Sequence, residues 1–192
     1  HEIRTPLTSL KLFLESVETE IAISPDYEED FQVAMSQVKR MEATISRFLD
    51  FARPQEPVFM SLNVGDLIEE ALLVVGPKAR QQETVIRKSI SSLLPEIKGD
   101  RRQLGEALLN LLVNGLEAVS GQGELSITAN LDSIPTRDGR QRCVRIEVRD
   151  TGPGIEAKHQ TRLFDPFFTT KATGAGLGLA IVMSTIQRHR GE

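Results

Sequence analysis

The start of the chain carries apolar side chains at alternating spacings of three and four, the repeat that turns one face of a helix toward a partner. One run starts at Ile3 and a second at Tyr27, with "AISPDYEED" between them. In that segment Pro25 ends the first helix, and Ser24 or Asp26 caps the second. The pattern predicts a helical hairpin with arms of roughly 30–40 Å at about 1.5 Å per residue. The seam positions are Ile3, Leu7, Leu10, Leu14, Val17 and Ile21, then Tyr27, Phe31, Ala34, Val38, Met41, Ile45, Phe48 and Ala52.

Further apolar side chains of this region lie outside the two seams. A lone hairpin leaves them in water, whereas pairing two hairpins into a four-helix bundle would cover both sets. We therefore expect a homodimer. The alternative is that the hairpin packs on the other half of its own chain. The residues outside the seams are Leu12, Phe13, Val33, Met35 and Leu49.

The pattern changes after "FARPQEP", where Pro54 and Pro57 stop the second helix and the polar residues indicate a linker. Strand-like and helix-like periods then alternate. We expect strands at "VFMSLNV", "TVIRKSI", "ELSITANL" and "CVRIEVRD", with "SIPTRDGRQR" as the loop between the last two. We expect helices at Asp66–Val75, at "DRRQLGEALLNLLVNGLEAV" and at "GLGLAIVMSTIQRHR". The predicted fold class is α+β, a helical hairpin followed by an α/β sandwich with helices on one face of a sheet.

Composition narrows the function classes. The 192 residues carry a net charge of −4 with mixed signs, which gives no basic surface for nucleic acid. Cys143 is the single cysteine, so a disulfide framework and a cysteine metal cluster are excluded. No apolar run approaches the roughly 20 residues of a membrane span, and we expect a soluble, cytoplasmic segment. We also expect the sequence to be truncated at both ends. Only an anchor or sensor domain upstream of it would then attach the protein to a membrane.

Two asparagines on the long predicted helix "DRRQLGEALLNLLVNGLEAV" are candidate metal ligands. Asn110 and Asn114 are four residues apart and therefore share one face, while the leucines around them form the apolar side. An amide oxygen is a neutral, hard ligand that suits Mg²⁺, whose other ligands are usually waters and substrate phosphates. The alternative is two exposed or capping asparagines with no ligand.

A second candidate is "RDTGPGI", which follows a strand-like stretch. It places Asp150 at a strand end, where its carboxylate can accept a proton from an amine such as that of adenine. Gly152 and Gly154 let the backbone approach a flat ring, because they have no Cβ. Taken alone, the segment is equally compatible with a plain turn.

The third candidate is "GAGLGLAIV", in which Gly174, Gly176 and Gly178 lead into a helix. Backbone amides at a glycine-rich helix start favour phosphate, because the unpaired N–H groups and the helix dipole point toward it. The spacing fits neither a P-loop nor a Rossmann motif.

The segment before this box, "RLFDPFFTTKATGAG", has the length of a mobile lid. We expect Phe164, Phe167 and Phe168 to pack it on the core, and Lys171 to meet a terminal phosphate.

The order of these motifs resembles the ATP-binding domain shared by histidine kinases, Hsp90, DNA gyrase B and MutL. "HEIRTPL" at the head of a heptad hairpin resembles the dimerisation and phosphoacceptor domain of sensor histidine kinases. "FARP" and "FDPFFTTK" resemble the nitrogen-regulator type of these kinases in particular. The resemblance implies a two-component kinase core: a hairpin at 1–53, a linker at 54–60 and an ATP-binding domain at 61–192, the first cut at its start and the last at its end.

The resemblance also implies residue roles. His1 would receive the γ-phosphoryl group of ATP and pass it to an aspartate on a response regulator receiver domain. Glu2 would orient and deprotonate the imidazole, and Thr5 would position water for dephosphorylating that partner. Asn114, helped by Asn110, would hold Mg²⁺, and Asp150 would recognise adenine. The residues expected to line the nucleotide and the lid are Gly152, Gly154, Lys171, Gly174, Gly176, Leu177 and Gly178.

The heptad register agrees with a reachable phosphoacceptor. With Ile3 at a d position, His1 and Thr5 fall at b and f, off the seam and on one face. Two other functions stay open. An ATPase of the Hsp90 or gyrase type would place a water-activating glutamate where Asn110 stands, with Glu106 as a weak substitute one turn earlier. A non-catalytic dimeric scaffold is the other.

Overall fold

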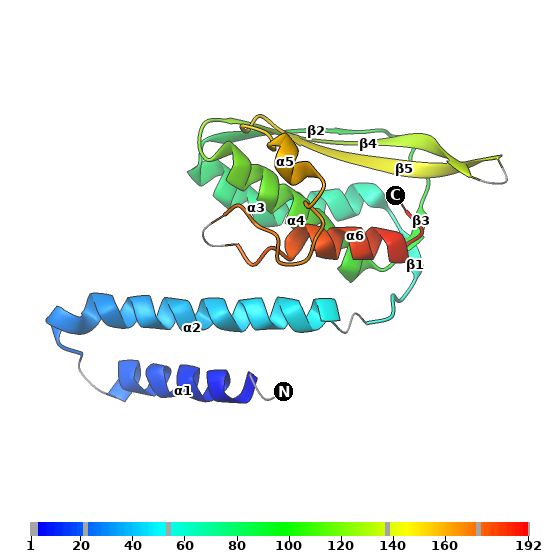
Figure 1. Cartoon of the computed structure of the whole chain (residues 1–192). Helices are drawn as coiled ribbons and strands as arrows, with labels where there is room; N and C mark the ends of the chain where they lie inside the picture. The colour runs from blue at the N-terminus through cyan, green and yellow to red at the C-terminus, as the bar shows by residue number, and fades with distance from the viewer. Residues whose placement is uncertain (1–3, 21–22, 53–54, 137–138, 172–173, 192) are drawn as a thin grey trace. The chain divides into compact units, whose positions relative to one another are not determined.

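The protein is described by a computed structural model that covers residues 4–20, 23–52, 55–136, 139–171 and 174–191 (Figure 1). It divides into two compact units, His1–Gln55 and Glu56–Glu192. Each unit is described below by itself.

The first unit is a hairpin of two helices, α1 (Arg4–Glu20) and α2 (Pro25–Ala52). Pro25 was expected to end the first helix, but it is the first residue of the second. Proline suits this position because a helix leaves its first N–H groups unpaired and because the ring fixes φ near the helical value. The backbone N–H of Tyr27 donates to the Ser24 carbonyl (2.9 Å) at the same turn.

The two helices of the hairpin pack through a narrow apolar contact. Leu7 of α1 and Met35 and Val38 of α2 are buried. The seam assignment was wrong at Met35, because Phe31, Met35 and Val38 also follow a four–three spacing and bury a larger side chain than the exposed Ala34. The assigned seam residues Leu10, Tyr27 and Met41 are also exposed in the single chain. An ion pair between Lys11 Nζ and Glu42 Oε2 (3.0 Å) and a hydrogen bond from Gln32 Nε2 to Glu18 Oε1 (3.1 Å) join α1 to α2.

The second unit is built on a mixed three-stranded sheet in the order β2-β4-β5. β2 runs parallel to β4, and β4 pairs with β5 in an antiparallel hairpin that sets Leu125 opposite Asp150. A separate antiparallel pair, β1 with β3, precedes α4 (Arg101–Val119) along the chain. The strands are β1 (Met60–Leu62), β2 (Thr84–Ile90), β3 (Ile97–Gly99), β4 (Gly123–Thr136) and β5 (Gly139–Asp150).

The β4–β5 hairpin is longer than the sequence predicted. Most of the expected loop "SIPTRDGRQR" belongs to the strands, because the pairing continues to Thr136 opposite Gly139. The side chains of this segment are mostly polar, so its sequence lacks the alternation of apolar and polar residues that predicts a strand. Arg140 supports the extension by donating from Nε to Ser133 Oγ and from Nη2 to the Ser133 carbonyl, both at 2.9 Å.

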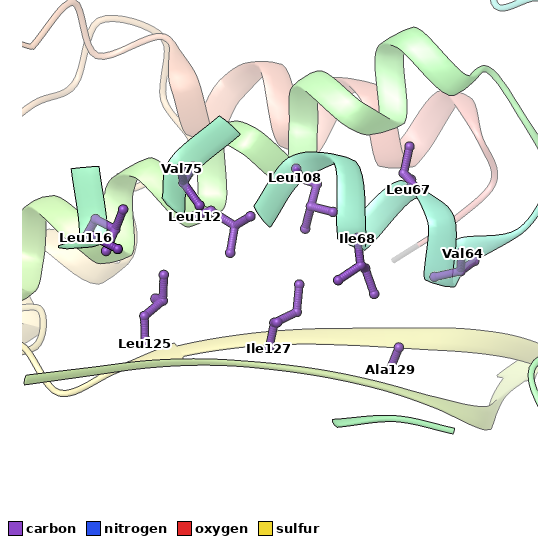
Figure 2. Packing of buried hydrophobic residues seen from close by; sticks show 12 residues of the cluster. Val64, Leu67, Ile68, Val75, Leu108, Leu112, Leu116, Leu125, Ile127 and Ala129 are labelled. Carbon is purple, nitrogen blue, oxygen red and sulfur yellow. The ribbon is translucent and has the colours of Figure 1, made fainter. Parts of the chain in front are cut away.

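The helices α3 and α4 cover one face of the sheet, which confirms the predicted sandwich. Figure 2 shows Leu125 and Ile127 pointing from the sheet toward Ile68, Leu112 and Leu116 on the helices. All five side chains are fully buried. The helices are α3 (Val64–Gln81), α4 (Arg101–Val119), α5 (Ala157–Gln160) and α6 (Gly178–Arg188), with α6 packed against α4.

Gly115 lets α4 lie close to the sheet. A Cβ at this position would stand 2.4 Å from Cδ1 of the buried Leu125 and 3.7 Å from Cβ of Asp150. Because Leu125 has no exposed surface, its side chain has little room to move away. The missing Cβ therefore sets the distance between α4 and the strand end that carries Asp150.

Asp100 caps α4 and joins it to the chain that enters the unit. The buried carboxylate accepts hydrogen bonds from the backbone N–H groups of Gln103 (2.9 Å) and Val58 (2.8 Å). Its own N–H donates to Nε2 of His189 (2.9 Å), so the proton of this imidazole lies on Nδ1, which donates to the Thr185 carbonyl (2.8 Å). One residue thus connects the linker end, the start of α4 and the end of α6.

Among the described residues, no helix is both long and apolar enough to cross a membrane.

Asp100→Ala is expected to lower the free energy of unfolding by about 1–2 kcal/mol, because the helix cap and the acceptor for Val58 are lost together. Burial alone would raise the pKa of Asp100, but the hydrogen bonds from Gln103 and Val58 and the charge of Arg102 hold it below its ordinary value of 3.8. The carboxylate therefore stabilises the fold fully above that value, and the stabilisation is lost as the pH falls through the lowered pKa.

Calorimetric unfolding at a series of pH values measures this effect. Asp66→Ala is the matched control, since Asp66 lies exposed in the first turn of α3. A loss for Asp100→Ala no larger than that of the control would contradict the capping role.

Candidate functional site

The two asparagines lie on the face of α4 that meets the start of α6. Asn110 Nδ2 donates to the Glu106 carbonyl (3.1 Å), which leaves its Oδ1 for another contact. A Cβ at Gly178 would stand 3.2 Å from Asn110 Oδ1 and 3.7 Å from Asn114 Nδ2. The structure thus brings these three sequence-predicted residues together, and glycine at 178 lets the start of α6 lie close to both amides.

Asp150 lies at the end of β5, beside the same helix. Its Oδ1 accepts a hydrogen bond from the Gly152 N–H (2.9 Å), which fixes the carboxylate over the turn. A Cβ at Gly152 would meet the Ala118 carbonyl oxygen at 2.8 Å, so the turn can contact the end of α4 only with glycine there. Gly154 has φ of +74°, a conformation that side chains disfavour. Oδ2 of Asp150 is the oxygen available to an amine donor.

The lid, a name we give to residues 155–171 and 174–177 between β5 and α6, makes many of its contacts within itself. Phe168 is half-buried, with the His159 ring at 5.4 Å and the Arg162 guanidinium at 4.7 Å from the centre of its ring. Phe164 and Phe167 are exposed, so the expectation that all three phenylalanines pack on the core was wrong for these two.

The glycine-rich segment 174–178, which we call the glycine box, contacts residues 167–169 of the lid through its backbone. The Phe167 N–H donates to the Gly176 carbonyl (2.9 Å), and both residues have φ of +67°. A Cβ at Gly176 would lie 2.5 Å from the Phe167 carbonyl carbon, and one at Gly174 would lie 2.7 Å from Thr169 Oγ1. Leu177, predicted to line the nucleotide, is 1% exposed, so only its backbone is within reach of a ligand.

Lys171 connects the lid to α4. Its Nζ donates to Asn114 Oδ1 (3.1 Å) and to Glu117 Oε2 (2.5 Å), and Lys78 Nζ lies 3.4 Å from Glu117 Oε1. Sequence reasoning missed Glu117, although its position three residues after Asn114 placed it on the same face. Burial would raise the pKa of Glu117, but the hydrogen bond and charge of Lys171, with Lys78, lower it. The carboxylate therefore stays charged to a lower pH than a free glutamate.

The expected phosphoacceptor residues belong to the first unit. His1 and Glu2 lie outside the described residues. Thr5 is exposed in the first turn of α1, where its carbonyl accepts a hydrogen bond from Ser9 Oγ (3.1 Å).

Comparison with known proteins assigns the family. A sequence profile described as "His Kinase A (phospho-acceptor) domain" matches residues 1–57, and one described as "Histidine kinase-, DNA gyrase B-, and HSP90-like ATPase" matches residues 99–192. The chain is 32% identical to the signal transduction histidine-protein kinase AtoS of Escherichia coli (strain K12) over all of its length and 30% of the length of AtoS. The chain belongs to the sensor histidine kinase family.

Solved structures of this family agree with the fold. The catalytic domain of the histidine kinase ThkA is 30% identical, with a TM-score of 0.60, over 69% of this chain and 82% of that domain. Full-length ShkA in complex with AMPPNP is 26% identical, with a TM-score of 0.79, over 98% of this chain and 39% of ShkA. The chain thus spans about a third of the full-length kinases it matches.

The amide oxygens of Asn110 and Asn114 are the groups of this site that could hold a hard cation. Asn114 Oδ1 already accepts a cationic donor, Lys171, so positive charge is accommodated beside it. Amide oxygens suit Mg²⁺ when phosphates and waters complete its ligand set. Within the part of the chain that the structure describes, no group of three His, Cys, Asp or Glu side chains could hold a metal. A metal at this site would depend on the amides and on a ligand's phosphates.

Gly176→Ala is expected to break the pairing of Phe167 with Gly176, because a Cβ both clashes with Phe167 and disfavours the positive φ. Hydrogen exchange of the Phe167 amide should accelerate at least about tenfold, the equivalent of roughly 1.4 kcal/mol. Gly105→Ala is the control, since its Cβ would make an ordinary 3.6 Å contact with Leu67. Unchanged exchange at Phe167 in Gly176→Ala would refute the role given to this glycine.

Proposed function

We propose that this chain is the kinase core of a two-component sensor. It transfers the γ-phosphoryl group of ATP to His1 and then passes it to an aspartate on a response regulator. The observation that carries the proposal is the meeting of Asn110, Asn114 and Gly178 beside Asp150, in a chain that also matches a phosphoacceptor domain. A nucleotide site and a phosphate acceptor on one chain are what autophosphorylation requires.

The nucleotide would lie between α4, the β5 end and the lid. Asp150 Oδ2 would accept the adenine amine, while Gly152 and Gly154 admit the ring. The start of α6 would face the phosphates with its unpaired N–H groups. Asn114, with Asn110, would hold Mg²⁺, which when bound neutralises charge on the phosphate oxygens. Lys171 would contact the terminal phosphate, and Gly174, Gly176 and Leu177 would form the glycine box around it.

In the transfer step, a ring nitrogen of His1 attacks the γ-phosphorus and the bond to the β–γ bridging oxygen breaks, so that ADP leaves. Glu2 beside it would orient the imidazole, stabilise by its negative charge the cationic ring that forms on attack, and then take up the ring proton, which leaves the phosphorylated ring neutral. Thr5, one turn further on the same face, would position a water for dephosphorylating the response regulator. We assign the hairpin to 1–53, the linker to 54–60 and the ATP-binding domain to 61–192.

We further propose that the hairpin dimerises into a four-helix bundle. Leu12, Phe13 and Val33 are more than half exposed in the single chain, and such a cluster is costly in water. A second hairpin would cover them. We place this part of the protein in the cytoplasm, where ATP and receiver domains are available.

An ATPase of the gyrase or Hsp90 type is less well supported. The position of the water-activating glutamate is occupied by Asn110, whose Nδ2 is bonded to a backbone carbonyl. Glu106, one turn earlier, lies 3.9 Å from Arg102 on the same helix. No feature of the described residues favours a scaffold that has lost activity.

Incubation of the full-length protein with γ-labelled ATP tests the proposed function. The expected product is an acid-labile, base-stable label on the protein that is absent from His1→Gln. His159→Gln is the matched control and should keep the label, since His159 packs on Phe168 in the lid. Release of free phosphate with no label on the protein would contradict the proposal and favour an ATPase.

A further inference from the structure

The contact of Lys171 with α4 raises a problem for the proposed nucleotide site. Its ammonium lies 3.1 Å from Asn114 Oδ1, the same oxygen that would hold a metal ion. A lysine and a divalent cation repel each other strongly at such distances when partly shielded from water. Lys171 must therefore leave Asn114 when a metal–nucleotide complex binds.

Glu117 is placed to keep Lys171 nearby when that happens. It stands nearly one helical turn beyond Asn114, and its Oε2 is 2.5 Å from Lys171 Nζ. Its other oxygen is held from α3 by Lys78 at 3.4 Å, which restrains the carboxylate from the opposite side. An ion pair of this kind can persist while the second acceptor of the ammonium changes, because an ammonium group has three donors.

We propose that Glu117 is a positioning residue for the lid. In the nucleotide-free protein it holds Lys171 against Asn114, so that the lid lies on α4 with a cation of the chain at the amide oxygen. On nucleotide binding Lys171 exchanges Asn114 Oδ1 for an oxygen of the terminal phosphate, while Glu117 keeps its hold on the ammonium. This inference rests on the proposed function and deepens it, since it makes Glu117 a determinant of selectivity for a nucleoside triphosphate over the diphosphate.

The charge balance at the end of α4 supports this assignment. Lys78 and Lys171 share one carboxylate, so the three groups carry a net charge of +1 toward the place where phosphates would lie. Replacing Glu117 by a neutral residue leaves two lysines facing each other without the anion between them. Lys171 would then move into solvent, and the lid would lose its connection to α4.

Two readouts on the full chain test the proposal. The first is hydrogen exchange of the amides of residues 161–171 and 174–176 without nucleotide, which should accelerate in Glu117→Gln and in Lys171→Ala. The second is the calorimetric affinity for AMPPNP relative to ADP, both with Mg²⁺. The ratio of the AMPPNP affinity to the ADP affinity should fall about tenfold in Glu117→Gln and in Lys171→Ala. It should fall no further when both substitutions are combined, because both remove the same interaction. Glu124→Gln, which breaks an ion pair with Arg87 on the sheet, should leave both readouts unchanged.

Exchanging the charges of residues 117 and 171 distinguishes the ion pair that holds the lid from the contact of Lys171 with the phosphate. The double variant Glu117→Lys with Lys171→Glu should restore slow exchange of the lid but not the preference for AMPPNP, because a carboxylate then faces the phosphate. Wild-type affinity ratios and lid exchange in Glu117→Gln would overturn the inference, as would tighter AMPPNP binding, which would make the contact inhibitory. Failure of the wild-type protein to bind either nucleotide would instead overturn the proposed function.

Discussion

The packing of α4 on the sheet is the constraint on which the rest of the second unit depends. Leu108, Leu112 and Leu116 recur on one face and are buried against the side chains of β4. A helix fixed in this way presents its other face at a set height and rotation, and that face carries Asn110, Asn114 and Glu117. Each of these three polar side chains is thus positioned by the burial of leucines on the opposite side of the helix. Gly115 brings the helix near Asp150, because no Cβ separates them.

Around this helix the site is assembled from parts with different stability. α4 and the end of β5 belong to the packed core, whereas the lid is held by backbone contacts at Gly176 and by the ion pair of Lys171. An exposed ion pair contributes little free energy and can be exchanged readily. This division suits a site that must keep its ligands in place and yet admit and release a nucleotide. The capping of α4 by Asp100 adds a link from the site-bearing helices to the incoming linker.

Periodicity and turn chemistry were enough to predict the sandwich and the helix that carries the asparagines. Only the family resemblance assigned Asn114 and Gly178 to one site. Local patterns failed where tertiary contacts decide. The strand pairing that reaches Thr136 involves residues without an alternating apolar pattern. In the hairpin Met35, and not Ala34, is buried between the helices, because its side chain fills more space. Phe167 is exposed, although it was expected to pack on the core. Glu117 was missed because a charged residue on a helix surface is usually only solvated. Its role depends on a lysine 54 residues away, a distance that local patterns do not span.

The central claim is that the polar face of α4 binds the phosphates of a nucleotide. Calorimetric titration of the magnesium complex of AMPPNP into the full chain tests it most directly, with Asn114→Ala compared against Asn130→Ala, an exposed asparagine on β4. The wild-type chain and Asn130→Ala are expected to bind the complex, and a folded Asn114→Ala is expected to bind it at least about tenfold more weakly. Equal affinity in all three proteins would contradict the central claim.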